Sequence, residues 1–89
     1  METMILEPTV HECIETIAKK KYWFLVEEYA KSDMIEEEKE REIDLLRKFL
    51  EEADIAMLRS ETENRLGKGE NPQVIIQLDE KGNLKMRVR

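Results

Sequence analysis

His11 and Cys13 are the only histidine and the only cysteine, the usual zinc ligands, among the 89 residues of this sequence. In a helix, His11 and Glu15 would lie four residues apart on one side, which is the spacing at which two side chains can bind the same metal ion. Two ligands are too few for a zinc site, and no HExxH or CxxC pattern occurs. A nucleophilic pair of Cys13 and His11 lacks a third, orienting group. We therefore predict no metal site and interpret Cys13 as a small core residue.

Carboxylates are abundant, but catalytic carboxylates need partly buried positions that shift their pKa values apart. Residues 36–42 are all charged and have no apolar neighbour that could bury them. We interpret this stretch as a solvated face, or as a docking surface for a basic partner protein formed by Glu36, Glu37, Glu38 and Glu40. The sequence also holds no P-loop, GxGxxG or GxSxG motif. We therefore predict no catalytic residues, no cofactor and no enzymatic activity.

Three lysines, Lys19 to Lys21, directly precede the aromatic run from Tyr22 to Phe24. Basic and aromatic residues together can bind single-stranded nucleic acid or anchor at a lipid surface. On a helix, however, the three lysines would fan around the axis and most of the aromatic residues would face the core. Trp23 lies off the main apolar stripe, so we single it out as an anchor for a partner protein.

A second basic group, Lys85, Arg87 and Arg89, alternates with apolar residues near the end of the chain. A β-ribbon with such a face can enter a DNA groove, which makes nucleic-acid binding the alternative function. The overall charge opposes it, since 21 acidic against 15 basic residues give a net charge of −6, which repels phosphate backbones. Salt bridging, or protection of a strand edge, is the role we favour for these bases.

The elements that would position these residues begin with two long helices. The first is predicted over residues 9–31, because Thr9 and Glu12 form a capping box and an apolar stripe at helical spacing follows. That stripe comprises Val10, Cys13, Ile14, Ile17, Phe24 and Leu25. The second is predicted over residues 33–66, starting at the capping pair Asp33 and Glu36 and ending before Gly67. Residues 67–72 form a connector.

Residues 73–89 are predicted to form a β-hairpin, because apolar and polar residues alternate on both sides of a turn that contains Gly82. Residues 1–7 are interpreted as a short lead that either extends or frays. The predicted fold is therefore a single α+β domain over residues 1–89, in which a two-helix hairpin precedes a two-stranded antiparallel β-hairpin.

Two strands alone are marginally stable, and both edges of the predicted hairpin are open. We therefore expect a homodimer or a stable hetero-complex. A homodimer could form through the hairpin edge, which would build a larger sheet, or through the helices, because the first helix is apolar over much of its girth. The expected function is a non-catalytic protein-interaction module, or a small accessory or inhibitory subunit, that presents its acidic helical surface to a basic protein. The longest apolar run, Tyr22 to Val26, is too short to span a membrane, and residues 1–8 do not resemble a signal peptide. By default we expect a cytoplasmic protein.

Overall fold

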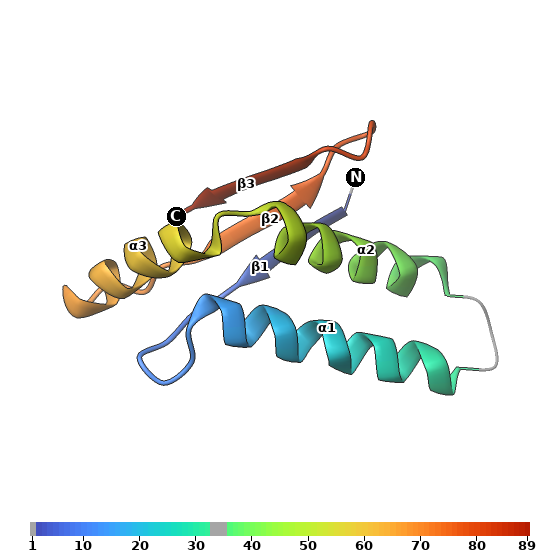
Figure 1. Cartoon of the computed structure of the whole chain (residues 1–89), viewed down its shortest axis with the longest axis horizontal. Coiled ribbons are helices and arrows are strands. Elements are labelled where there is room, and N and C mark those ends of the chain that lie inside the picture. Colours follow the sequence, from blue (N-terminus) through green and yellow to red (C-terminus); the bar gives the residue numbers. More distant parts are fainter. Residues whose placement is uncertain (1, 33–35) are drawn as a thin grey trace.

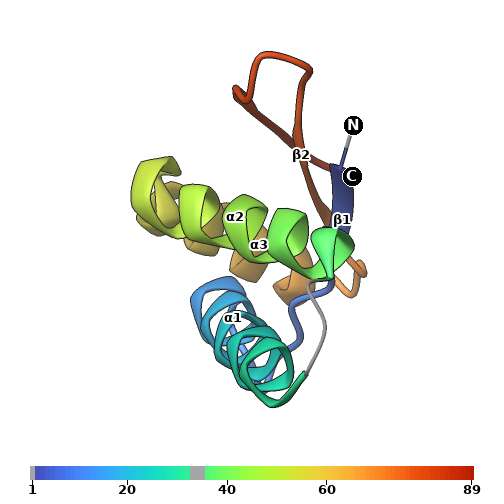
Figure 2. The ribbon, with the colours of Figure 1, turned by 90° about the vertical axis from the view of Figure 1, so that its right-hand side faces the viewer.

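The computed structural model describes residues 2–32 and 36–89, which fold into helices on one side of an antiparallel sheet (Figures 1 and 2). The α+β class is confirmed, but the described residues contain three helices and three strands where the sequence predicted two of each. In chain order the elements are β1 (Glu2–Leu6), α1 (Ile14–Lys31), α2 (Glu37–Glu52), α3 (Ile55–Gly67), β2 (Val74–Leu78) and β3 (Leu84–Val88).

The sheet has the order β1-β2-β3, with β2 in the centre and both neighbours antiparallel to it. Of the two predicted states of residues 1–7, extended or frayed, residues 2–6 are extended, but the sequence did not predict that they pair with β2 and so cover the edge of the hairpin opposite β3. Within β1, Met4 and Leu6 are buried whereas Ile5 between them is 47% exposed. This alternation is the strand period of two, carried by too few residues to stand out in the sequence.

The core lies between the sheet and α2. Helix α2 contacts all three strands and also α1, and its Leu45, Leu46 and Phe49 are completely buried. The sheet contributes Val74 and Ile76 of β2 together with the buried residues of β1. Helix α1 packs against α2 and α3 and contacts the sheet at β1. Helix α2 therefore has neighbours on two sides, the sheet and α1, whereas α1 has neighbours on one side.

The first helix begins at Ile14, five residues later than predicted. The Thr9 hydroxyl does accept hydrogen bonds from the backbone N–H groups of His11 (3.2 Å) and Glu12 (3.1 Å). These bonds close a turn that redirects the chain from β1, and the N-cap residue of α1 is Cys13. Because Leu6 and Pro8 are both buried, the chain has to turn before a helix can start.

The second predicted helix is interrupted at Ala53 and Asp54, so the prediction of one helix over residues 33–66 is wrong. The Asp54 carboxylate accepts a hydrogen bond from the backbone N–H of Met57 (3.0 Å) and caps α3. An unbroken helix of that length would span about 50 Å, whereas five-residue strands span about 17 Å. The break lets α3 turn, so that it buries Leu58 and Thr62. The predicted capping pair of Asp33 and Glu36 involves a residue outside the described ones.

The β-hairpin lies where the alternation placed it, with Gly82 at a φ of 81° in the turn. The Asp79 carboxylate accepts hydrogen bonds from the backbone N–H groups of Asn83 (2.8 Å) and Lys81 (2.9 Å). These bonds lower the pKa of Asp79 below its ordinary value, with the Asn83 bond as the largest cause. The Lys48 ammonium donates to the Gly82 carbonyl and so joins α2 to the turn.

Candidate protein-interaction surfaces

Helix α1 presents two adjacent aromatic side chains to solvent, which we call the aromatic surface. Trp23 and Phe24 are each 61% exposed, and Trp23 stacks edge-to-face with Tyr22 at 5.3 Å between ring centroids. The opposite side of α1 buries Ile14, Ala18 and Leu25 against the rest of the fold. The assignment of Phe24 to the core stripe is therefore wrong, and so is that of Val10, which is 74% exposed.

Charged residues rim the aromatic surface. Lys19 pairs with Glu15 at 3.4 Å, and Lys20 pairs with Glu12 at 2.6 Å. The side chains of Lys19 and Lys20 line shallow grooves beside Trp23, Phe24 and Glu27. Lysine stems are apolar, so they extend the apolar area while their ammonium groups stay hydrated. An apolar centre with a polar rim is typical of protein-protein interfaces.

The four predicted acidic residues, Glu36, Glu37, Glu38 and Glu40, lie together at the start of α2, and we call them the acidic group. Lys39 pairs with Glu36 at 3.1 Å, and Arg41 lies 3.9 Å from Glu37. The Tyr29 hydroxyl donates a hydrogen bond to Glu40 (2.8 Å), which raises the pKa of Tyr29. Much of the acidic charge is therefore compensated by neighbouring side chains.

The structure does not bring Trp23 and the acidic group together. Tyr29, which contacts Glu40, lies on the side of α1 that packs against α2. Trp23 precedes Tyr29 by six residues, which places the two side chains about 120° apart around the helix axis, so they lie on different faces of α1. The sequence singled out Trp23 and the acidic residues as partner-binding for separate reasons, and the packing of the helices shows that they lie on different faces.

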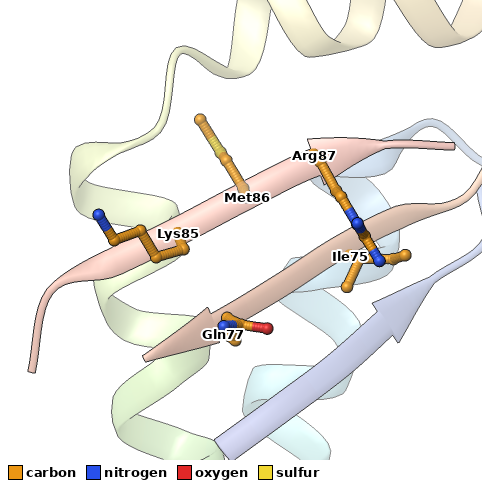
Figure 3. A pocket seen from close by; sticks show the side chains of 5 residues that line it. All are labelled: Ile75, Gln77, Lys85, Met86 and Arg87. Carbon is orange, nitrogen blue, oxygen red and sulfur yellow. The ribbon is translucent and has the colours of Figure 1, made fainter. Parts of the chain in front are cut away.

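Lys85, Arg87 and Arg89 lie on the face of the sheet that no helix covers, which we call the outer face. Lys85 stands opposite Gln77, and Arg87 stands opposite Ile75 on β2. In Figure 3 the Arg87 side chain reaches across the sheet toward Ile75, while Met86 points away from the other labelled side chains. Ile75 is only 7% exposed, although it lies outside the core cluster. Its neighbours on the outer face therefore shield it.

The edge of β3 is open along the described part of the chain, because no strand lies beyond it. Gln73 and Arg89 exchange both of their backbone hydrogen bonds (3.1 and 2.8 Å). In an antiparallel ladder such pairs alternate, so Arg87 and Lys85 also bond to β2. The backbone groups of the intervening residues then point outward from the sheet; these are Leu84, Met86 and Val88.

Cys13 lies at the N-terminus of α1, outside the core cluster to which the sequence assigned it. Its thiol is 3.3 Å from the Thr16 hydroxyl. Hydrogen bonds from the side chain and backbone of Thr16 lower the pKa of Cys13, and Arg59 lowers it further. Because the helix begins after His11, the predicted helical spacing of His11 and Glu15 does not form. Among the described residues no three or more His, Cys, Asp or Glu side chains gather into a possible metal site.

Comparison with known proteins gives two matches. A protein-family model matches residues 1–88. An uncharacterized protein of Archaeoglobus fulgidus is 51% identical over an alignment of 49 residues that covers 53% of this chain and 58% of that protein. The chain thus spans 58% of the length of this relative. No solved structure matches the chain. Within the described residues, none of the helices has the length and apolarity needed to cross a membrane.

Proposed function

The chain belongs to the family whose model matches residues 1–88, and from this premise we propose that the whole fold is one non-catalytic protein-interaction module that works as a homodimer. The observation that carries the proposal is the exposure of Trp23 and Phe24, 61% each, side by side on α1. Large aromatic side chains are enriched in interfaces and among the residues that dominate binding energy. An exposed pair of them on a small domain indicates a surface that a partner covers.

The partner that we propose for this surface is a second copy of the chain. In a two-fold symmetric pair, two α1 helices run antiparallel, so residues equally far before and after the axis face each other. With the axis between Trp23 and Phe24, Trp23 lies beside the partner's Phe24. Lys20 then lies beside the partner's Glu27, and the same pair recurs on the other side. The helix is thus complementary to itself in shape and charge.

The hairpin edge is a less suitable dimer interface than α1. Antiparallel pairing of two β3 strands about Met86 would place Lys85 opposite the partner's Arg87, twice. Like charges directly opposite each other on one sheet face destabilise the pairing. Shifting the register by two residues replaces these contacts with other contacts between bases, such as Lys85 with the partner's Lys85. The larger sheet expected from the sequence therefore has less support than an α1 dimer.

The acidic group remains the contact that we propose for a basic partner protein, with the dimer as its accessory or inhibitory subunit. Its contribution is smaller than the sequence indicated, because Lys39 and Arg41 compensate Glu36 and Glu37 within the same helix. Glu38 has no ion pair within the described residues. Capture of a basic partner would weaken as salt is added, since exposed charges more than a Debye length apart are screened.

Sedimentation equilibrium over a wide concentration range tests the dimer. The wild-type chain should move from its 10.6 kDa protomer mass to twice that mass as concentration rises. Trp23→Ala should weaken the dimer by about 2 kcal/mol, or about 30-fold in Kd. In Phe24→Ala, which keeps the only tryptophan, Trp23 emission should lose its shift to shorter wavelength as concentration rises.

A charge exchange tests the antiparallel arrangement. Lys20→Glu should weaken association, and adding Glu27→Lys to it should restore much of the loss because the pair is rebuilt in reverse. Lys68→Glu, on the exposed connector, is the matched control for the change in net charge. A chain that stays at 10.6 kDa at millimolar concentration contradicts the proposal. So does a dimer that Trp23→Ala leaves intact.

A further inference from the structure

The edge of β3 combines two features that an α1 dimer leaves unused. The outward backbone groups of Leu84, Met86 and Val88 repeat every second residue. Between them, Lys85, Arg87 and Arg89 project from the outer face of the sheet. We propose that this edge binds an extended acidic segment of another protein as a fourth strand of the sheet. The partner segment would carry acidic residues at alternate positions and apolar residues between them.

The backbone of β3 supplies the donors and acceptors for a fourth strand. Each of its three outward residues offers one N–H and one C=O in the sheet plane, which is the pattern that strand addition uses. Met86 is 39% exposed, whereas Leu84 and Val88 pack against the core cluster. Apolar side chains of an added strand would therefore cover Met86 and continue the layer that faces the helices.

The side chains of β3 select acidic partners. The four helical arginines, Arg41, Arg47, Arg59 and Arg65, each lie within 4.0 Å of a carboxylate on their own helix. Arg87 and Arg89 make no ion pair with any described residue. In a chain with 21 acidic residues, the fold brings no described carboxylate within ion-pair distance of these two guanidinium groups, and Glu7 on the outer face accepts a hydrogen bond from Gln73 instead. Carboxylates on an added strand, opposite Lys85, Arg87 and Arg89, would form ion pairs with these bases.

Two other occupants fit this edge less well. A second copy brings its own Lys85 and Arg87 against the same residues, as described above. A nucleic acid could pair its phosphates with the bases, but it makes no use of the outward backbone groups. The net charge of −6 would also oppose its approach. Only an acidic strand matches the backbone and the side chains of β3 together.

Nuclear magnetic resonance titration of the isotope-labelled full chain tests the proposal. The probe is a peptide with the sequence Glu-Val-Glu-Ile-Glu between glycines, and its matched control replaces every Glu with Lys. With the acidic peptide, the amides of Leu84, Met86 and Val88 should shift and their hydrogen exchange should slow. The basic peptide should leave these three amides unchanged.

Two variants separate strand addition from simple charge attraction. Met86→Pro removes one outward N–H that the β2 ladder does not use, so the fold should survive and peptide binding should weaken about tenfold. Met86→Ala is its control, because it truncates the side chain and keeps the N–H. Arg87→Gln should also weaken binding and reduce its dependence on salt. Backbone spectra of each variant report whether the sheet is intact.

Two results would overturn the proposal. In the first, millimolar acidic peptide does not shift the amides of Leu84, Met86 and Val88. In the second, Met86→Pro and Met86→Ala bind the acidic peptide equally. Tighter binding of a single-stranded oligothymidylate than of the peptide would establish the nucleic-acid reading in its place. The titration is repeated with Trp23→Ala, in which the proposed dimer is disrupted. Binding by that variant would show that β3 acts independently of α1, so the two proposals fail separately.

Discussion

Helices α1 and α2 pack against each other, yet they use their apolar residues in opposite ways. Helix α1 is the more apolar of the two, with the run from Tyr22 to Val26 at its centre, but it leaves Trp23 and Phe24 exposed. Helix α2 is mostly charged, but three of its five large apolar side chains, Leu45, Leu46 and Phe49, are completely buried, and Ile43 and Leu50 are partly buried. Burial in this fold thus follows the number of neighbouring layers and not the apolar content of a helix.

This difference separates the stability of the protein from its proposed function. Helix α2 lies between the sheet and α1, so its apolar stripe is buried by residues of the same chain. Helix α1 has neighbours on one side, so its outward aromatic residues cost the monomer little and remain available to a partner. Changes on α2 should therefore act on folding, and changes on the outer side of α1 should act on association.

The largest expected effect separates two phenylalanines. Phe49→Ala should lower the free energy of unfolding by about 3–5 kcal/mol, because it removes a fully buried side chain and leaves a cavity. Phe24→Ala should change it by less than about 0.5 kcal/mol. Urea unfolding, at concentrations where the chain is monomeric, measures both. Should Phe49→Ala fail to fold, Phe49→Leu provides a milder test, and equal losses at the two positions would invalidate the comparison.

A smaller effect is expected at the two helix starts. Asp54→Ala should cost about 1 kcal/mol, because the Asp54 carboxylate accepts the backbone N–H of Met57 at the start of α3. Cys13→Ala should cost less than about 0.5 kcal/mol, since Cys13 makes no side-chain capping bond at the start of α1. The same urea experiment compares them. If Cys13→Ala lowers the free energy of unfolding more than Asp54→Ala does, the contact between the Cys13 thiol and the Thr16 hydroxyl stabilises α1 more than the Asp54 cap stabilises α3.

The smallest expected effect is at the contact between α1 and α2. The folded pKa of Tyr29 is raised because its hydroxyl donates to Glu40. This contact therefore stabilises the fold fully below the unfolded pKa of tyrosine, about 10, and the contribution is lost as pH rises through the folded value. Tyr29→Phe should lack this part of the pH dependence while keeping that of the lysines. Urea unfolding at pH 8 and at about pH 11 should differ more for the wild type than for Tyr29→Phe.

The sequence predicted the parts of the fold that have a strong local signal. The α+β class, the hairpin with its turn at Gly82 and the apolar face of α2 all follow from periodicity and turn chemistry. The break at Asp54 was missed, because Asp54 also fits the polar face of a continuous helix. Strand β1 was missed since five residues give a weak pattern, and its pairing partner lies near the other end of the chain.

The candidate surfaces were only partly predictable, for a physical reason. Trp23 was singled out because it lies off the apolar stripe, and its exposure agrees with that reasoning. Phe24 was assigned to the core, because a helical stripe does not reveal on how many sides a helix has neighbours. The alternation of Lys85, Arg87 and Arg89 was visible in the sequence. The covering of the other hairpin edge by β1, which leaves β3 as the exposed edge of the hairpin, required the structure.

Strand β1 also has a consequence for the order in which the fold assembles. Glu2 pairs with Leu78, and all three helices lie between β1 and β2 along the chain, so β1 can join the sheet only after this long segment has folded back. Contacts this far apart in sequence slow folding, whereas α1 with α2 and β2 with β3 can form from nearby residues. Met4 and Leu6 would therefore remain without their β2 neighbours until the hairpin has formed. A partly folded chain would then expose this short apolar segment to chaperones.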